Sequence, residues 1–254
     1  MAKLDGYFVW YELMTTDPGA AEAFYGEVIG WQVEPFQGAP MPYALWKVDG
    51  TSVGGCMQLP PEAQEAGPHW IGFVQVDDID ASVAKAESLG GRCLVPAADI
   101  PEVGRFATLA DPRGGTLSIF KPAKDEMSVP DPARDGDFSW HEHGTDELAS
   151  AFDFYAGLFG WSVAEDMDMG PGGIYRLYQV GEHQLGGFYQ RGPGMPDMGH
   201  GFLYYIKVGD LDAALARVEK HGGTKVAGPM PVPGGSRIGL CRDPQGAAFA
   251  LTGK

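Results

Sequence analysis

The chain repeats itself almost from end to end, and this repeat limits the folds that are open to it. The first copy begins with FVWYELMTTDPGAAEAFYGEVIGW (8–31), and the second begins with FSWHEHGTDELASAFDFYAGLFGW (138–161). Further along, DIDASVAKAESLGG is matched by DLDAALARVEKHGG, and GRFATLADPRGGTLSIF is matched by SRIGLCRDPQGAAFALT. Self-similarity over this length indicates a duplicated structural unit, so we expect two domains of the same fold.

Each copy contains a second, fainter repetition. Asp17 is a good N-cap for a first helix, which is expected to end at Gly30. Three short β-like runs follow this helix, around 32–33, 43–48 and 54–59. The strand-like run HWIGFVQV then precedes a helix that opens at Asp78, and three more β-like runs follow at 92–95, 105–109 and 116–120. One copy therefore reads as βαβββ twice, and the whole chain reads as βαβββ four times.

The expected domain boundaries follow from this pattern. Residues 1–122 form the first domain and residues 137–254 form the second. The segment 123–136 between them is rich in proline and charge, and it is expected to be a linker.

Composition excludes several classes of function. The formal net charge of -16 disfavours nucleic acid as a partner, because a polyanion is held by lysine and arginine. No apolar run is long enough to span a bilayer, and the start lacks a secretory signal, so we expect a cytoplasmic protein that does not bind membranes. Three cysteines without metal-binding spacing fit reduced thiols. There is also no P-loop, dinucleotide-binding or nucleophile-elbow motif.

The repeated motifs resemble a known family. Two βαβββ motifs per domain, the helix pattern D-x-x-x-A-x-x-FY-x-x-x-x-GW and a closing D-P-x-G turn are similar to the vicinal oxygen chelate superfamily. That superfamily includes glyoxalases, bleomycin-resistance proteins and extradiol dioxygenases, and the two-domain form here resembles its glyoxalase-like "hydroxylase"/27 kDa antigen group. The resemblance implies an α+β fold, in which each domain is a cupped mixed β-sheet with helices outside.

The same resemblance implies where a divalent metal would be held in the enzymes of the superfamily. The corresponding positions lie on the first, fifth and last strands of a domain, and their residues are Trp10, Ile71 and Ser118 in copy one and Trp140, Leu203 and Ala250 in copy two. Indole and aliphatic groups offer no lone pair to a divalent cation, and serine alone is a poor ligand. No metal and no other cofactor is therefore expected. A metal held by Glu12, His69 and Ser118 remains an alternative.

Trp10 and Trp140 stand where the metal would be, and two interpretations of them stay open. They could line an apolar, aromatic cavity that binds a ligand, or they could fill the space as ordinary core. Tyr205 shares the strand face of Leu203 and is a further candidate for lining the second cavity. Ser118 would face the cavity of the first domain.

Glu12 and Glu142 share a strand face with the two tryptophans, because residues two apart on a strand point the same way. A carboxylate in a mostly apolar cup needs partners or has a raised pKa. Arg105 and Arg237 are the candidate partners. Functionally each glutamate could be a general base or an anchor for a ligand's hydroxyl or amine; the alternative is a structural ion pair or a carboxylate at the rim.

The histidines do not form a recognised metal motif. His141 and His143 flank Glu142, so alternation turns both away from the cup, toward helix packing or the other domain. His69 lies on the face of Ile71 near the start of its strand, and it could stand at the mouth of a cavity.

Three functions remain open on this basis. The first is a metal-independent protein that binds a small, partly aromatic organic molecule. The second is a glyoxalase-like lyase or isomerase that acts on a carbonyl compound with Glu12 or Glu142 as base. The third is a scaffold whose cups are filled. A homodimer is plausible for this superfamily, although nothing in the residues requires it.

Overall fold

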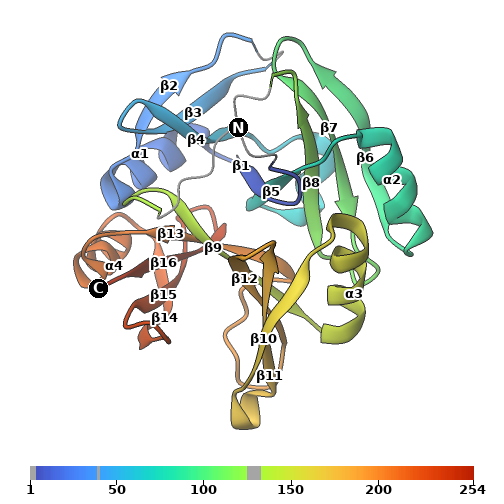
Figure 1. Cartoon of the computed structure of the whole chain (residues 1–254). Coiled ribbons are helices and arrows are strands. Elements are labelled where there is room, and N and C mark those ends of the chain that lie inside the picture. The colour runs from blue at the N-terminus through green and yellow to red at the C-terminus, as the bar shows by residue number, and fades with distance from the viewer. Residues whose placement is uncertain (1–3, 39–40, 125–132) are drawn as a thin grey trace.

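Two eight-stranded mixed sheets make up the chain, and the computed structural model describes residues 4–38, 41–124 and 133–254 of it. The strand order is β2-β3-β4-β1-β5-β8-β7-β6 in the first sheet and β10-β11-β12-β9-β13-β16-β15-β14 in the second. Each sheet contains two βαβββ modules (Figure 1), which confirms the predicted α+β fold. Of the expected linker 123–136, residues 125–132 lie outside the described residues.

The elements of the first domain follow the predicted order. They are β1 (Phe8–Thr15), α1 (Pro18–Ile29), β2 (Gln32–Pro35), β3 (Tyr43–Val48), β4 (Thr51–Gln58), a short 3₁₀ helix η1 (Pro61–Ala66), β5 (His69–Gln75), α2 (Ile79–Ser88), β6 (Arg92–Ile100), β7 (Gly104–Ala110) and β8 (Thr116–Pro122).

The second domain has the same order. Its elements are β9 (Phe138–Thr145), α3 (Leu148–Phe159), β10 (Ser162–Asp168), a 3₁₀ turn η2 (Gly170–Gly172), β11 (Ile174–Val180), β12 (His183–Gln190), β13 (Gly201–Lys207), α4 (Leu211–Lys220), β14 (Thr224–Pro231), β15 (Arg237–Arg242) and β16 (Ala248–Gly253).

The first strands of the two modules lie side by side at the centre of each sheet. β1 pairs antiparallel with β5, and each of these strands pairs in parallel with the last strand of its own module, β4 or β8. A parallel return needs a crossover, which the helix of each module provides. Helix α1 begins where the sequence predicts, because the Asp17 carboxylate accepts a hydrogen bond from the Ala20 amide at 3.0 Å.

The helices of the two domains meet in pairs. Figure 1 shows α1 beside α4 and α2 beside α3, and both pairs are in contact. The central strands β5 and β13 are also in contact, so a single large core contains helix-facing side chains of both domains. The face of each sheet that is turned away from its helices, called here the cup face, has a separate apolar cluster. Within the described ranges no helix is long and apolar enough to cross a membrane.

Candidate functional site

The cup face of each domain has a tryptophan, a tyrosine and a glutamate joined together. In the second domain the Trp140 indole N–H donates to the Tyr175 hydroxyl at 3.0 Å, and that hydroxyl donates to Glu142 Oε2 at 2.9 Å. An indole N–H can only donate, so the Tyr175 oxygen is the acceptor of this hydrogen bond. The phenolic proton of Tyr175 is then available for Glu142. The result is a fixed direction of hydrogen bonding from indole to phenol to carboxylate.

The first domain repeats this network. The Trp10 indole N–H donates to the Tyr43 hydroxyl at 3.0 Å, and this hydroxyl interacts with the Glu12 carboxylate. Trp10 and Glu12 share the cup face because side chains alternate along a strand. A bulge in β1 between Phe8 and Trp10 shifts this alternation and so determines which side chains point toward the cup. We name the two sets the Trp–Tyr–Glu networks: Trp10, Tyr43 and Glu12 in the first domain, and Trp140, Tyr175 and Glu142 in the second.

Glycines on the neighbouring strand make room for the two tyrosines. Gly55 is the register partner of Glu12, and Gly187 is that of Glu142. A Cβ atom on Gly55 would collide with the Tyr43 ring, and one on Gly187 would collide with the Tyr175 ring. The second glycine of each Gly-Gly pair is therefore required by the tyrosine ring, while a Cβ atom on the first glycine, Gly54 or Gly186, would collide with a backbone carbonyl of the neighbouring strand.

Burial raises the pKa of both carboxyl groups. The pKa of Glu12, which is only 9% exposed, rises to about 7, and the interaction with Tyr43 opposes this shift. Burial likewise raises the pKa of Glu142, and Tyr175 and Tyr205 oppose the rise. No lysine, arginine or histidine of the described part of the chain forms an ion pair with either glutamate. A ligand that supplies a hydrogen-bond donor or a positive charge would stabilise either carboxylate.

The prediction that Arg105 and Arg237 would pair with these glutamates is wrong. Arg105 binds Asp99 on the adjacent strand β6 at 3.0 Å and Asp80 in helix α2 at 3.1 Å. Arg237 binds Asp212 in helix α4 at 2.9 Å. Both arginines lie at the start of a strand near the outer helix, where an acidic residue in the first turn of that helix is the nearest partner.

The positions that correspond to a metal site do not fit a metal. Ile71 and Leu203 lie in the apolar clusters of the cup faces, and Ala250 packs beside Leu203. The buried Ser118 hydroxyl is already hydrogen-bonded to Thr108 at 2.9 Å. Among the residues that the structure describes, no three His, Cys, Asp or Glu side chains come together in a way that could hold a metal ion.

His69 and Tyr205 occupy the cup faces. His69 is the register partner of Met14 at the start of β5, and one ring nitrogen lies 2.7 Å from the Gly67 carbonyl. Tyr205 is the register partner of Trp140 and is 2% exposed. Its hydroxyl approaches Glu142, but it does not reach any partner among the described residues with hydrogen-bond geometry.

The histidines beside Glu142 point away from the cup face, as alternation predicts. A ring nitrogen of His141 lies 2.6 Å from the Tyr11 hydroxyl of the other domain. His143 is fully buried and lies 3.1 Å from Asp111, which belongs to the D-P-x-G turn of the first domain. Both histidines therefore help to hold the domains together, on the face of the sheet opposite to the Trp–Tyr–Glu network.

Tyr43 and Tyr175 are the residues that sequence reasoning missed. Both face the cup and connect a tryptophan to a glutamate. A signal was present, because the two tyrosines occupy equivalent positions of the repeat, each followed twelve residues later by the second glycine of a Gly-Gly pair. Only the register of the strands shows that the ring crosses over that glycine.

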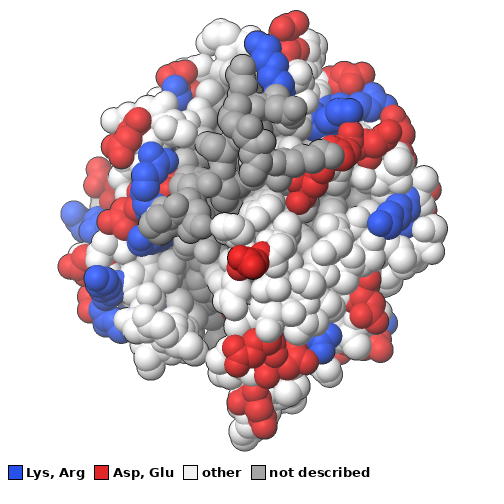
Figure 2. All heavy atoms as spheres, viewed as in Figure 1, with Lys and Arg blue, Asp and Glu red and all other residues white. Residues whose placement is uncertain are grey.

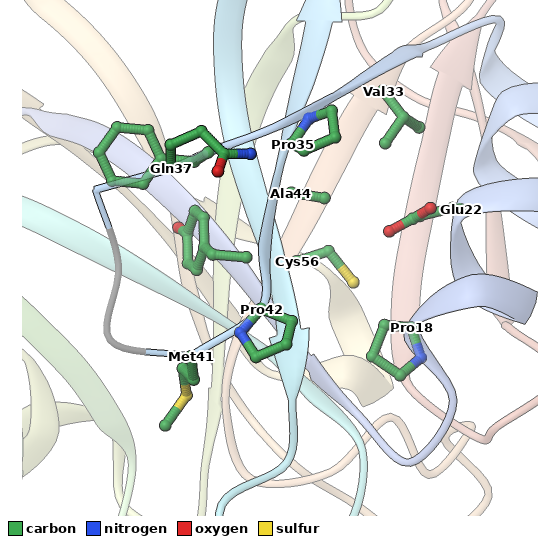
Figure 3. A pocket seen from close by; sticks show the side chains of 11 residues that line it. Pro18, Glu22, Val33, Pro35, Gln37, Met41, Pro42, Ala44 and Cys56 are labelled. Carbon is green, nitrogen blue, oxygen red and sulfur yellow. The ribbon is translucent and has the colours of Figure 1, made fainter.

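A pocket in the first domain borders the first Trp–Tyr–Glu network, because Tyr43 is one of its lining residues. It has a volume of about 510 Å³ and is lined by helix α1, β2 and the segment that leads into β3 (Figure 3). Ala44 and Cys56, which line it, belong to the core on the helix-facing side of the sheet. Burial raises the Cys56 pKa beyond the range in which its thiol would ionise at neutral pH.

Charged groups are spread unevenly over the surface. Figure 2 shows acidic residues gathered at the end of β10 and β11, with a broad uncharged area above them. Glu165, Asp166 and Asp168 are exposed acidic residues of β10. The net charge of -16 makes the protein attractive to cations at long range.

Two family models match the chain. The glyoxalase-like domain matches residues 10–120, and the glyoxalase/bleomycin resistance protein/dioxygenase superfamily matches residues 142–251. Each match covers the greater part of one sheet.

Curated relatives match over nearly their full length. "Putative glyoxylase CFP32" of Mycobacterium tuberculosis is 32% identical over 245 residues, which are 95% of this chain and 92% of the relative. The anthracycline biosynthesis protein DnrV of Streptomyces peucetius is 27% identical over 263 residues, with 95% and 91% covered. Among solved structures, 2,2',3-trihydroxybiphenyl 1,2-dioxygenase of Sphingomonas wittichii is 15% identical with a TM-score of 0.67, and 100% of this chain and 91% of the dioxygenase are covered. The last similarity shows the fold alone.

Proposed function

Because the chain belongs to the glyoxalase/bleomycin resistance protein/dioxygenase superfamily, we propose that it uses its cup faces to bind a small, partly aromatic organic molecule, and that it does so without a metal ion. The observation that carries this proposal is the pair of Trp–Tyr–Glu networks. Each combines aromatic surface with one carboxylate that has no cationic partner among the described residues.

The chemistry of the networks favours binding of an organic ligand. An indole and a phenol offer flat apolar surfaces for a ring, while the carboxylate accepts hydrogen bonds from a ligand's polar groups. The hydrogen bonds within each network hold these groups in place before the ligand arrives, which lowers the entropy cost of binding.

A screen of small aromatic compounds by NMR tests the proposal. Compounds that bind at the cup faces will shift the indole N–H signals of Trp10 and Trp140, which are assigned by their loss in Trp10→Phe and Trp140→Phe. The four remaining tryptophans serve as internal controls, because all of them are buried in the core on the helix-facing side of the sheets. They are Trp31, Trp46, Trp70 and Trp161. If no aromatic compound shifts either cup signal, the cups are filled and the protein is a scaffold.

A second function, catalysis, is favoured by the pKa of Glu12. A carboxylate with a pKa of about 7 is suited to general-base catalysis near neutral pH. In a glyoxalase-like isomerisation it would take a proton from carbon next to a carbonyl group and return it to the neighbouring atom. The curated relative CFP32 is named as a glyoxylase, which agrees with this alternative.

Elemental analysis together with thermal unfolding in the presence of divalent metals separates the two functions. We expect no stoichiometric metal and no specific stabilisation, because the corresponding positions carry Trp10, Ile71 and Ser118. A metal that stabilises the protein, and does so no longer in Glu12→Ala, would contradict metal-independent binding and favour the lyase.

A further inference from the structure

The two cup faces differ in the groups around their glutamates. Tyr43 and Tyr175 are equivalent, but Tyr205 and Tyr189 of the second domain correspond to Phe73 and Met57 of the first. The second cup face therefore adds two phenols next to a carboxylate. These phenols set it apart chemically from the first.

All three phenols of the second cup face interact electrostatically with Glu142. Tyr175 donates a hydrogen bond to it, and the charge of Glu142 raises the pKa of both Tyr189 and Tyr205 beside the effect of burial. The Tyr189 hydroxyl lies over Gly144, where a Cβ atom would stand 2.8 Å from it. Trp140 is the register partner of Tyr205, so aromatic side chains surround the carboxylate from strands β9, β11, β12 and β13.

The Glu142 carboxylate is largely surrounded by aromatic side chains and lacks a charged partner among the described residues. Burying an ion costs free energy unless an opposite charge or several hydrogen bonds compensate. Glu142 has one hydrogen bond of standard geometry, from Tyr175, and it has no ion pair with any described residue. The Tyr205 hydroxyl is buried and has no hydrogen-bond partner among those residues. A ligand can therefore provide a positive charge to the Glu142 carboxylate and a hydrogen-bond partner to the Tyr205 hydroxyl.

The missing partner is best supplied by a positive charge. Aromatic faces attract cations through their quadrupole, and a carboxylate attracts them directly. An ammonium group also has N–H donors that can reach both Glu142 and the free lone pairs of the Tyr205 oxygen. An anion would be repelled by Glu142 and by the overall charge of -16.

The glutamate of the second cup face is also the more exposed of the two. Glu142 is partly exposed, whereas Glu12 is only 9% exposed. Leu4 and Tyr7, from the N-terminal segment, pack against the apolar cluster of the first cup face. On the second cup face, the loop between β12 and β13 contributes Met198 to the apolar cluster, and among the described residues none from the segment before β9 joins it.

We propose that the cup face of the second domain binds an organic amine in its protonated form, with Glu142 as counter-ion and Trp140, Tyr175, Tyr189 and Tyr205 around the ammonium group. This inference rests on the proposed function, since it names the class of ligand for one of the two cup faces.

Three probes with one ring and different head groups test the charge preference. Calorimetric titration of the whole protein at pH 7.5 with 2-phenylethylamine, 2-phenylethanol and phenylacetate compares a cation, a neutral molecule and an anion. We expect the amine to bind at least tenfold more tightly than the alcohol, and phenylacetate to bind most weakly. The Trp140 indole signal should shift with the amine.

Glu142→Gln is the decisive variant, because glutamine keeps a carbonyl acceptor for Tyr175 and has nearly the same shape, while it removes the negative charge and replaces one oxygen by an NH2 group. The preference for the amine over the alcohol should fall at least fivefold in this variant. Glu165→Gln, an exposed residue of β10 in the same domain, is the matched control for net charge and should keep the preference. Because both variants remove one negative charge, their comparison separates the effect of the Glu142 charge at the site from the effect of the protein's net charge.

The outcomes distinguish this inference from the proposed function. If the alcohol binds as tightly as the amine, or if Glu142→Gln keeps the preference, the second cup face does not select a cation, while aromatic binding stands. If none of the three probes binds and none shifts the Trp140 signal, both the inference and binding at this cup face are overturned.

Discussion

Tyr11 and His141 occupy equivalent positions in the two copies of the repeat, and in the folded protein their side chains meet, with 2.6 Å between the Tyr11 oxygen and His141 Nε2. Phe8 stacks on His141 with ring centroids 4.2 Å apart, and the equivalent Phe138 stacks on Tyr11 at 3.8 Å. Each domain thus presents the same pair of positions to the other. The domains are related by a pseudo-twofold axis that passes close to this contact.

Acid should weaken the interface through His141. Burial lowers the pKa of His141 from 6.5 to about 4, so the folded protein favours the neutral ring. The stabilisation is present above pH 6.5 and is lost as the pH falls toward 4, by about 1.4 kcal/mol per pH unit. Denaturant unfolding at pH 7, 6 and 5 should show this loss, and His141→Phe should reduce its slope. An unchanged slope in the variant would rule out His141 as the source.

The two D-P-x-G turns should differ in their contribution to stability. From the other domain, Asp111 accepts hydrogen bonds from both Tyr155 and His143, whereas Asp243 accepts one from Tyr25 alone among the described residues. Burial alone would raise the pKa of Asp111, but His143 and the hydrogen bonds hold it below its usual value; burial raises that of Asp243.

Substituting each aspartate by asparagine tests this difference. Asp111→Asn should cost about 2–4 kcal/mol at pH 7, because a buried hydrogen-bond network that uses both carboxylate oxygens loses its charge and one of its two acceptors. Asp243→Asn should cost less than about 1.5 kcal/mol, because burial already disfavours the charged carboxylate at this site and fewer donors from the other domain depend on it. Denaturant unfolding of both variants provides the comparison, and equal losses would contradict the asymmetry.

Removing the Glu12 charge should stabilise the protein at high pH. The folded pKa of about 7 lies above the ordinary value of 4.5, so wild type loses stability as the pH rises from 4.5 through 7. Glu12→Gln avoids this loss and should be more stable than wild type by about 2–3 kcal/mol at pH 8. The advantage should vanish near pH 4.5. If Glu12→Gln is instead less stable at pH 8, the carboxylate is stabilised by a partner.

Space above Gly187 should be essential for the second network. Gly187→Ala places a methyl group in the Tyr175 ring and should cost about 1–3 kcal/mol of unfolding free energy. The double variant with Tyr175→Ala should remove most of this extra cost, because the obstructing ring is gone. Gly192→Ala is the control, since the nearest atom to its Cβ is 3.9 Å away. Thermal and denaturant unfolding of the wild type, Gly187→Ala, Tyr175→Ala and the double variant measures the coupling between the two positions.

The duplicated pattern was enough to predict much of the fold. Helix starts at Asp17 and Asp78 were readable because an N-cap is a local feature. The placement of Glu12 beside Trp10, and of His141 away from the cup, followed from alternation along one strand. These conclusions need only residues near one another in the chain.

Contacts between distant segments could not be predicted in the same way. Arg105 was expected near Glu12, yet its partners are Asp99 and Asp80, because the guanidinium lies toward the outer helix. Tyr43 reaches Glu12 only because the register of three strands brings its ring over Gly55. Register and the direction of a long side chain depend on packing between strands, which a local pattern does not contain.

The sequence by itself determined the four βαβββ modules, their family and the pairing of Trp with Glu on one strand face, because periodicity and capping are local properties of the chain. Only the tertiary structure decided that Tyr43 and Tyr175 complete the networks and that Glu12 and Glu142 lack a basic partner among the described residues. It also decided that Tyr11 faces His141, because the two domains pack through faces that no single copy of the repeat specifies.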